Sequence, residues 1–408
     1  MGFDTTFLLG SGFALAAFLL GFWANAPKKK KGAPWPLIFS VGALILLLSL
    51  SGGLLLKTKA HPGVIAKPLS SIPTPLPAEV AAQDSASNAV LYGKALVPDS
   101  LPDGAKEYHL TLSAFPWQVY PGLTLLAWGF NHQVPGPLIR LRVGEKVRFV
   151  VENQLSQTTT LHWHGLAVPF HQDGVPGVTQ KVIPSGGKFT YQFTVTPEMV
   201  GTHLYHTHVN DDFQMDQGLH GVLIVDPSGA PHTHYDQEAV YEMSSFKAGL
   251  EGEEENTFAF NGKAFPESPV LNVALGSRVL LRLVNASAEQ SHVMHLHGYT
   301  FQVVALDGNP LEHPYKANTV LLGPSQTADV AFKADRPGQW MFQCHFLDHV
   351  MNPVSREVRD EMREDRAICP MGGLVTFVNV AGSGKVSRDF LPAGSITRDP
   401  TCSPLFSR

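Results

Sequence analysis

The stretch Leu138-Ile139-Arg140-Leu141-Arg142-Val143, continued by Lys146-Val147-Arg148-Phe149-Val150-Val151, decides the fold class. In both runs apolar residues largely alternate with charged ones, and Gly144 lies between the runs. Side chains of a β-strand point alternately to opposite faces, so this pattern predicts short strands with one buried face. From about Glu107 onward similar runs recur between Gly and Pro residues. Strands this short and closely spaced are typical of antiparallel sandwiches, and we expect an all-β fold here.

The β region contains an internal repeat. Phe130-Asn131 precedes a turn, two strands around Gly144, and the motif Leu161-His162-Trp163-His164-Gly165. Phe260-Asn261 likewise precedes two strands around Gly276 and the motif Met294-His295-Leu296-His297-Gly298. Later in each half come Tyr205-His206-Thr207-His208 and Phe342-Gln343-Cys344-His345. Two copies of one β-domain explain these parallels. We expect domain 1 over residues 106–232, domain 2 over 233–390 and a C-terminal tail over 391–408.

Two apolar runs precede the β region, at about 7–23 and 35–56, and each approaches the ~20 residues that a membrane helix needs. Between them lies the basic loop Lys28-Lys29-Lys30-Lys31, which the positive-inside rule places in the cytoplasm. A transmembrane helical hairpin over residues 1–57 is therefore expected as a membrane anchor. A cleaved signal peptide ending near Ala24-Asn25-Ala26 is the alternative, although the first four residues lack the positive charge that such a peptide carries.

Both alternatives export the rest of the chain. Residues 58–105 are rich in Pro, Ala and Ser and show little periodicity, which predicts a linker that holds the soluble part away from the membrane. The soluble domains are thus expected on the extracytoplasmic side, in a periplasm or at the cell surface.

The composition excludes several classes of protein. With 30 Lys and Arg against 35 Asp and Glu, the formal net charge is -5, so nucleic acid is not an expected partner. The three cysteines, Cys344, Cys369 and Cys402, cannot form a disulfide framework or a four-cysteine zinc site. One of them can serve a metal while Cys369 and Cys402 pair, and that pairing stays open. Histidine is the unusual residue, with 18 copies.

Six of these histidines form three His-x-His pairs. Residues at i and i+2 of a strand project from the same face, so each pair presents two imidazoles together. Imidazole is a common ligand of copper and zinc, and matching pairs in a duplicated domain favour a metal centre over surface coincidence. The zinc-hydrolase motif His-Glu-x-x-His is absent from the sequence. The pairs are His162 and His164, His206 and His208, and His295 and His297.

Cys344 indicates which metal is bound. It precedes His345, and His349 follows four residues later, while His292 lies beside the third His-x-His pair. Two histidines and one thiolate define the blue-copper electron-transfer site. Because Cys344 and His345 point to opposite faces of one strand, this strand can supply ligands to two metal centres.

These motifs resemble those of the multicopper oxidases, in their two-domain laccase-like form with the type 1 copper in the second domain. The resemblance rests on His-x-x-His-x-His-Gly at His292–Gly298, on Cys-His-x-x-x-His at Cys344–His349, and on Asp173–Gln180. It covers about residues 106–380. It implies two cupredoxin-like Greek-key β-sandwich domains and up to four copper ions per chain. It also implies that single electrons pass from a phenolic or low-valent metal donor to molecular oxygen, which is reduced to water.

The resemblance also implies a role for each ligand. Type 1 copper is expected on His292, Cys344 and His349, and type 2 copper on His162 and His295. One type 3 copper is expected on His164, His206 and His345, and the other on His208 and His297. Asp173 corresponds to a family carboxylate that helps to deliver protons, although it can equally be a turn former before Gly174. His171, His203 and His220 adjoin the motifs and are candidates for orienting the ligands.

The sequence departs from the family pattern in two places near the ligands, and its soluble part is shorter than that of the three-domain members. Gln343 stands where the family has a type 3 histidine, so one ligand of the second type 3 copper is replaced by an amide. A charged insertion, 355–366, precedes Gly372-Gly373-Leu374. Alignment gives Leu374 the axial place of the type 1 copper, with Met371 as the alternative.

The short soluble part has a consequence for assembly. Ligands of the copper cluster come from both domains, and two-domain relatives assemble it between neighbouring chains, so a homotrimer is expected. The alternative function is a copper-binding or electron-transfer protein in which Gln343 impairs oxygen reduction. A nitrite-reducing copper trimer would need its type 1 ligands in domain 1, where Tyr205-His206-Thr207 offers no cysteine.

Overall fold

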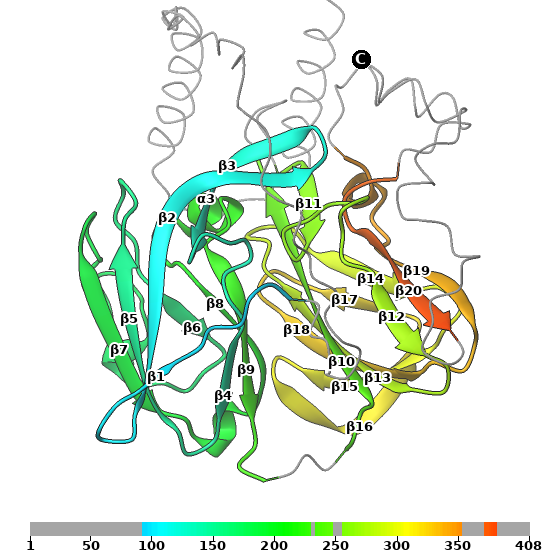
Figure 1. Ribbon diagram of the computed structural model, residues 1–408, viewed down its shortest axis with the longest axis horizontal. Coiled ribbons are helices and arrows are strands. Elements are labelled where there is room, and N and C mark those ends of the chain that lie inside the picture. Colours follow the sequence, from blue (N-terminus) through cyan, green and yellow to red (C-terminus); the bar gives the residue numbers. More distant parts are fainter. Residues whose placement is uncertain (1–91, 230–232, 248–254, 353–370, 382–408) are drawn as a thin grey trace, which may run out of the picture. The chain divides into compact units, whose positions relative to one another are not determined.

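The computed structural model describes residues 92–229, 233–247, 255–352 and 371–381 (Figure 1). The chain divides into two compact units, Met1–Ala82 and Gln83–Arg408, and every described residue lies in the second. The expected hairpin over 1–57, the tail over 391–408, Cys369 and Cys402 lie outside the described residues. Among the described residues, no helix combines the length and apolarity needed to cross a membrane.

Domain 1 consists of two sheets. The first has five strands in the order β1-β2-β5-β7, with β3 also paired to β2, and the second has four in the order β4-β9-β8-β6. The strands are β1 (Asp99–Ser100), β2 (Lys106–Tyr120), β3 (Leu123–Phe130), β4 (Ile139–Arg142), β5 (Lys146–Asn153), β6 (His162–His164), β7 (Lys188–Thr194), β8 (Gly201–His206) and β9 (His220–Asp226). The helical turns are η1 (Phe170–Gln172), η2 (Pro197–Met199) and α3 (Asp211–Asp216).

Domain 2 has the same plan. Its sheets have six strands in the order β11-β10-β13-β18-β15-β16 and five in the order β12-β20-β19-β14-β17. The strands are β10 (Gln237–Phe246), β11 (Thr257–Phe260), β12 (Leu271–Ala274), β13 (Arg278–Asn285), β14 (His292–Leu296), β15 (Phe301–Leu306), β16 (Asn309–Ala317), β17 (Thr319–Leu322), β18 (Thr327–Lys333), β19 (Gly338–Cys344) and β20 (Val375–Ala381). The turn η3 spans Leu347–Val350.

The strand pairing reproduces the repeat seen in the sequence. In domain 1, β2 pairs in parallel with β5 and β4 with β9; in domain 2, β10 pairs in parallel with β13 and β12 with β20. The histidine strands β6 and β14 pair antiparallel with β8 and β19, respectively. The expected duplication of a mostly β domain is therefore confirmed.

Each domain buries its own apolar core. Tyr108, Phe149 and Trp163 are central to domain 1, and Phe260, Met294 and Phe342 to domain 2. Trp163 is fully buried while His162 and His164 on either side of it are half-buried. The alternation that the sequence predicts for a strand thus directs the imidazoles away from the core.

A third apolar cluster lies between the domains. It joins Leu204 and Val222 of domain 1 to Val240 and Val284 of domain 2, and Tyr92 belongs to it as well. Tyr92 is 5% exposed, and its hydroxyl donates to Glu242 Oε2. Tyr92, within the expected linker, is therefore packed into the folded unit, because its aromatic ring fills the junction between the domains, whereas residues 93–104 are exposed or half-buried.

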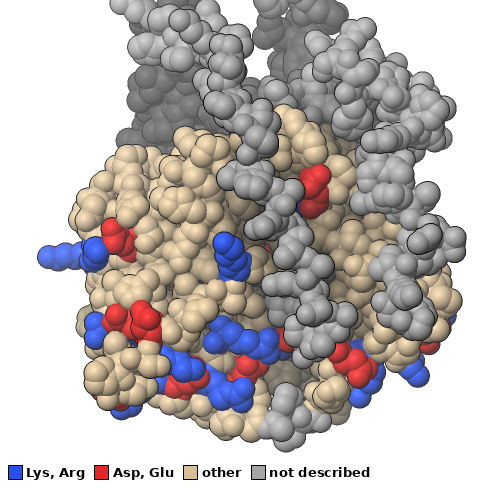
Figure 2. All heavy atoms as spheres, viewed as in Figure 1, with Lys and Arg blue, Asp and Glu red and all other residues tan. Residues whose placement is uncertain are grey.

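Charged residues of both signs lie close together on the surface. Figure 2 shows basic and acidic side chains side by side over the lower part of the face in view. Arg140 pairs with Asp226 at 2.7 Å and with Glu238 at 3.0 Å, which connects the two domains. Arg282 donates to Asp329, and Thr202 of domain 1 donates to the same carboxylate at 2.7 Å. Polar contacts thus surround the apolar junction.

Candidate metal centres

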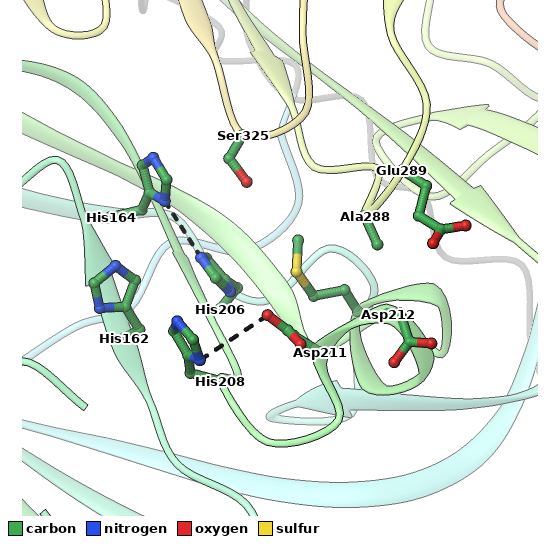
Figure 3. Close-up of a pocket in the computed structure, with 10 residues that line it drawn as sticks. His162, His164, His206, His208, Asp211, Asp212, Ala288, Glu289 and Ser325 are labelled. Atoms are coloured by element: carbon green, nitrogen blue, oxygen red, sulfur yellow. Dashed lines mark hydrogen bonds and ion pairs between the residues drawn. The ribbon is translucent and has the colours of Figure 1, made fainter. Parts of the chain in front are cut away.

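The first candidate centre is a pocket of about 360 Å³ lined by four histidines of domain 1. His162 on β6 lies directly opposite His206 on β8, so the two strands present their imidazoles on one face. Ligand atoms of His162, His164 and His206 lie within 4.8 Å of one another. The His208 ring centroid is 5.4 Å from that of His162. Figure 3 shows the four rings gathered at one side of the pocket. We call this set the four-histidine pocket.

Burial keeps three of these imidazoles, those of His162, His164 and His206, in the form that binds metal. It lowers the pKa of His162 and His164, and the proximity of other histidines lowers both further. The pKa of His206 is held well below its ordinary value for the same two reasons. A neutral imidazole offers a lone pair to a cation, whereas a protonated one does not. The site is therefore prepared for a metal near neutral pH.

Backbone carbonyls orient two of the rings. His162 Nδ1 lies 2.7 Å from Asp173 O, and His206 Nδ1 lies 2.6 Å from Thr207 O. A donating Nδ1–H leaves Nε2 as the metal-binding atom, which is the usual arrangement around a bound ion. Gly174 makes this possible, because its φ is +92° and a Cβ there would lie 1.9 Å from Leu161 O. The Asp173 carboxylate is also 3.5 Å from His162 Nδ1.

The second candidate centre is formed by His295, His297 and His345 of domain 2. The ring centroids of His295 and His297 are 4.7 Å apart, and those of His295 and His345 are 5.8 Å apart. His345 is exposed, whereas the other two are half-buried. His297 Nε2 is buried without a hydrogen-bond partner. We call this set the three-histidine face.

Gln343 belongs to this face. It lies directly opposite His295 in the β14–β19 pairing, and facing residues of neighbouring strands project to the same side. Its neighbours Phe342 and Cys344 are buried in the core, while Gln343 is half-buried. The amide therefore lies where an additional donor from this strand would be placed.

The four-histidine pocket and the three-histidine face do not meet within one chain. Across the described residues, no hydrogen bond or ring contact joins the two sets. Domain 2 instead closes the pocket with Ala288, Glu289 and Ser325. Figure 3 shows these residues across the pocket from the histidines.

The third candidate centre lies inside domain 2 and is complete within one chain. His292, Cys344 and His349 are all buried, and their ligand atoms lie within 4.8 Å of one another. Cys344 Sγ is 4.0 Å from His292 Nδ1 and 3.6 Å from His349 Nδ1, and the two Nδ1 atoms are 3.1 Å apart. Two imidazole nitrogens and one sulfur converging in an apolar site form the donor set of blue copper.

Contacts behind the rings hold this third centre in place. His292 Nε2 lies 2.8 Å from Ser287 Oγ, and the His349 ring stacks on Phe258 at 4.0 Å. Burial lowers the pKa of His292 well below its ordinary value and that of His349 to about 4. Burial also raises the pKa of the Cys344 thiol, which backbone N–H groups partly offset. A bound cation would favour the thiolate, because coordination displaces the thiol proton.

The two axial candidates occupy different environments. Leu374 is fully buried in the same apolar cluster as Cys344, and it is hydrogen-bonded to both ligand segments. Cys344 N donates to Leu374 O at 3.0 Å, and Leu374 N donates to His349 O at 2.9 Å. Met371 packs instead near Phe265 and Phe377. The surroundings of the third centre therefore favour Leu374 over Met371 as the axial neighbour.

Several residues at these centres escaped the sequence analysis. Asp211 lies 3.9 Å from His208, and Ser287 and Phe258 support the third centre. Of these, Asp211 had a usable signal, since it follows His208 by three residues at the start of a helical turn.

Three further histidines had been expected to orient ligands, and each has another partner. His171 Nδ1 lies 3.2 Å from Thr179 O, and His203 Nε2 lies 2.8 Å from Met199 O. His220 Nδ1 contacts Glu242. His203 nevertheless lies close to the motif of domain 1, because a Cβ on Gly165 would be 2.7 Å from its ring.

Comparisons with known proteins agree with this geometry. Residues 116–230 and 239–363 each match a family model described as multicopper oxidase. The structure resembles the multicopper oxidase mgLAC, with 33% identity, a TM-score of 0.61, and coverage of 71% of this chain and 94% of that chain. It also resembles the blue copper oxidase from Nitrosomonas europaea, with 29% identity, a TM-score of 0.60, and coverage of 72% and 95%.

Curated relatives include Laccase-2 of Oryza sativa subsp. japonica, which is 32% identical over 314 residues. That match covers 67% of this chain and 54% of the relative. Laccase-2 of Cryptococcus neoformans is 28% identical over 229 residues, which covers 47% of this chain and 38% of the relative. The chain thus spans about half or less of the length of these relatives.

Proposed function

The chain belongs to the multicopper oxidase family, and from this premise we propose that it oxidises a small reducing substrate with molecular oxygen as the acceptor. Family members bind type 1, type 2 and type 3 copper. Copper in the three centres would supply one-electron transfer at one end and reduction of oxygen to water at the other. The donor sets fit this metal, because imidazole and thiolate are ligands that copper prefers.

The pair Cys344 and His345 carries the proposal. Cys344 is buried beside His292 and His349, while His345 is exposed on the three-histidine face. One peptide bond thus connects the third candidate centre, which is complete within one chain, to an imidazole of the second candidate centre. This short covalent path gives electrons a direct route between the two.

We assign the ligands as follows. His292, Cys344 and His349 would hold type 1 copper, and Leu374, which packs with Cys344, would offer it no thioether sulfur. His162 and His295 hold type 2 copper. Type 3 copper is held by His164, His206 and His345 on one ion and by His208 and His297 on the other, with Gln343 as a weak additional donor. Asp173, whose carboxylate lies 3.5 Å from His162 Nδ1, would supply a proton to the reaction under this proposal.

The cluster requires a second copy of the chain under this assignment. Four of its ligands lie in the four-histidine pocket and three on the three-histidine face, and these sets do not meet among the described residues of one chain. Apposing the pocket of one copy to the face of the next brings seven histidines together. A ring of three copies closes such a head-to-tail contact, so we propose a homotrimer.

The N-terminal segment and the donor are further parts of the proposal. Residues 1–57 anchor the chain as a transmembrane hairpin, and the soluble domains face the extracytoplasmic side. The donor is phenolic or a low-valent metal ion, and it approaches the type 1 site near exposed Phe346, whose ring centroid lies 5.3 Å from that of His349.

Copper stoichiometry, measured together with oxygen uptake, tests the proposed function. Up to four copper ions per chain, with oxygen consumed when a phenolic donor is added, is the expected result. Light scattering of the detergent-extracted protein measures the number of chains in the assembly, and we expect three. A copper-loaded, active monomer would show that both sets of histidines meet within one chain.

The alternative function is electron transfer without efficient oxygen turnover. Gln343 favours it, since an amide oxygen is a weaker donor to copper than an imidazole nitrogen. One copper per chain with an intense visible band, and no oxygen uptake, would establish this alternative.

A further inference from the structure

Two buried acidic side chains interact at the junction between the domains. Asp216 ends the helical turn α3 of domain 1 and is 1% exposed, and Glu255 precedes β11 of domain 2 and is 8% exposed. All four of their carboxylate oxygens are buried, and when both groups are ionised none of them has a hydrogen-bond donor within the described residues apart from the Lys247 ammonium. The Lys247 ammonium, 3.0 Å from Asp216 Oδ2, is their one ion-pair partner among the described residues.

The charges at this junction do not balance without a proton. Two carboxylates and one ammonium leave a net charge of minus one, and an unpaired charge in a buried site is costly. A proton on one carboxyl removes that charge. It also gives that carboxyl an O–H group, which can donate a hydrogen bond to the other carboxylate. Accordingly, the pKa of Asp216 is raised to about 8, first by burial, then by its hydrogen bond to Glu255 and by the charge of Glu255, with Lys247 opposing.

The helical turn that carries Asp216 also forms a wall of the four-histidine pocket. Asp211, Asp212 and Met215 of α3 line that pocket, and Asp211 lies 3.9 Å from His208. The same turn contacts β10, the strand that leads to Lys247. The negative charges of Asp212 on α3 and of Glu289 help to raise the pKa of Lys247, and Glu289 lines the pocket from domain 2. The acidic pair thus lies behind the wall of a metal centre.

We propose that Asp216 and Glu255 share one proton that fastens α3 to domain 2, and that this bond positions the wall of the four-histidine pocket for metal binding. The pair acts through α3 and touches no ligand, so both are positioning residues. The part of this inference that concerns metal binding rests on the proposed function, whereas the proton bond between the domains does not. The charged groups that face the pair are Lys247 directly and, through it, Asp212 and Glu289.

The sign of the pH dependence follows from the direction of the shift. A carboxyl whose pKa is raised on folding stabilises the folded state when it is protonated. Its contribution is complete below the pKa of the unfolded chain and is lost as pH rises through about 8. Above that pH two like charges are buried together, and α3 is expected to separate from domain 2.

A pH series of thermal unfolding on the copper-free full-length protein tests the bond itself. The midpoint of the wild type is expected to fall between about pH 7 and about pH 9. In Asp216→Asn and in Glu255→Gln, an amide replaces the protonated carboxyl, so at least half of this fall should disappear. Lys247→Gln should move the fall to higher pH, because the ammonium favours ionisation. Glu198→Gln, which changes an exposed carboxylate of domain 1, is the matched control and should follow the wild type.

Copper retention over the same pH range tests the positioning role. The wild type is expected to lose copper from the cluster above about pH 8, and Asp216→Asn should retain it, with the visible band of the buried type 1 site unchanged in both. Unfolding curves for Asp216→Asn and Glu255→Gln that parallel the wild type would overturn the shared proton. Retention curves that do not move with these substitutions would overturn the positioning role. A protein that binds no copper at any pH would instead contradict the proposed function, and the unfolding series would still decide whether the proton joins the domains.

Discussion

The same interior position is occupied differently in the two halves of the duplicated chain. In domain 2, His292 and Cys344 converge with His349 in the buried thiolate centre. The corresponding positions of domain 1 are Thr159 and Thr207, whose hydroxyl oxygens lie 2.9 Å apart. Both contact Gln214 Oε1, at 2.9 and 2.7 Å, and all three residues are fully buried.

Even the backbone around the two positions matches. Thr207 N donates to Leu219 O at 3.1 Å, as Cys344 N donates to Leu374 O at 3.0 Å. One scaffold therefore supports either a metal-binding set or a closed hydrogen-bond network, and the side chains alone decide which. Three of the four outward-facing histidines of domain 1 have a histidine counterpart in domain 2, although the inner positions differ, so the inner and outer faces of these strands do not vary together.

The largest expected effect comes from removing the sulfur that distinguishes domain 2. Cys344→Ser should abolish the intense visible band, because that band arises from donation by a thiolate to copper. Absorption spectroscopy measures it, and circular dichroism is the control, since a serine of similar size should preserve the fold. A colourless wild-type protein with full copper content would remove the basis of the comparison.

A smaller effect is expected where domain 2 departs from domain 1 on the outer face. Gln343 corresponds to His206, so Gln343→His makes the two halves alike and supplies an imidazole beside His295. Copper content should rise by up to about one ion per chain and oxygen consumption should increase, while the visible band of the type 1 site stays unchanged. If neither quantity changes, the cluster is complete without this histidine, and the alternative of electron transfer loses its support.

The network of domain 1 should contribute measurable stability. Thr159→Val removes a buried hydroxyl and leaves Thr207 and Gln214 with one partner fewer, at a cost of about 1–3 kcal/mol in the free energy of unfolding. Denaturant unfolding of the copper-free protein measures this cost. Thr194→Val, at an exposed position on β7, is the matched control and should change the free energy by less than about 0.5 kcal/mol. Equal values for the two variants would show that the network contributes nothing specific.

The smallest effect is expected at Leu374, which corresponds to Leu219 of domain 1. Leu374→Met conserves volume, so it should cost less than about 1.5 kcal/mol of stability. A thioether near copper favours the oxidised ion, and the reduction potential of the type 1 site should therefore fall while the visible band is retained. Redox titration measures the potential. An unchanged potential would show that residue 374 is not the axial neighbour of the type 1 copper, and Met371 would be the next candidate.

Much of this molecule followed from local pattern in the sequence. Alternation around Gly144 and Gly276 predicted the strands β5 and β13, which end at Asn153 and Asn285 as expected. The His-x-His spacing predicted imidazoles on one face, and the adjacency of Cys344 and His345 predicted ligands on opposite faces. These inferences succeeded because the period of a strand is two residues and depends only on the backbone.

Other features depended on segments that are far apart in the chain. Tyr92 lies in a stretch whose sequence predicts a linker, yet its ring is buried at the domain junction, where Glu242 accepts a hydrogen bond from its hydroxyl. Asp216 and Glu255 carry no pattern that pairs them across 39 residues. Their meeting is a consequence of how α3 packs against domain 2, and packing is settled by the free energy of the whole folded unit.

The sequence by itself thus determined the duplicated β architecture, the copper-type donor set and the face on which each ligand projects. Tertiary structure alone decided that the thiolate centre closes within one chain, whereas the four-histidine pocket and the three-histidine face remain apart. It also decided that Leu374 rather than Met371 lies beside Cys344. The physical reason is that a side chain's direction is set by its neighbours along the backbone, while its partners are set by contacts between distant segments.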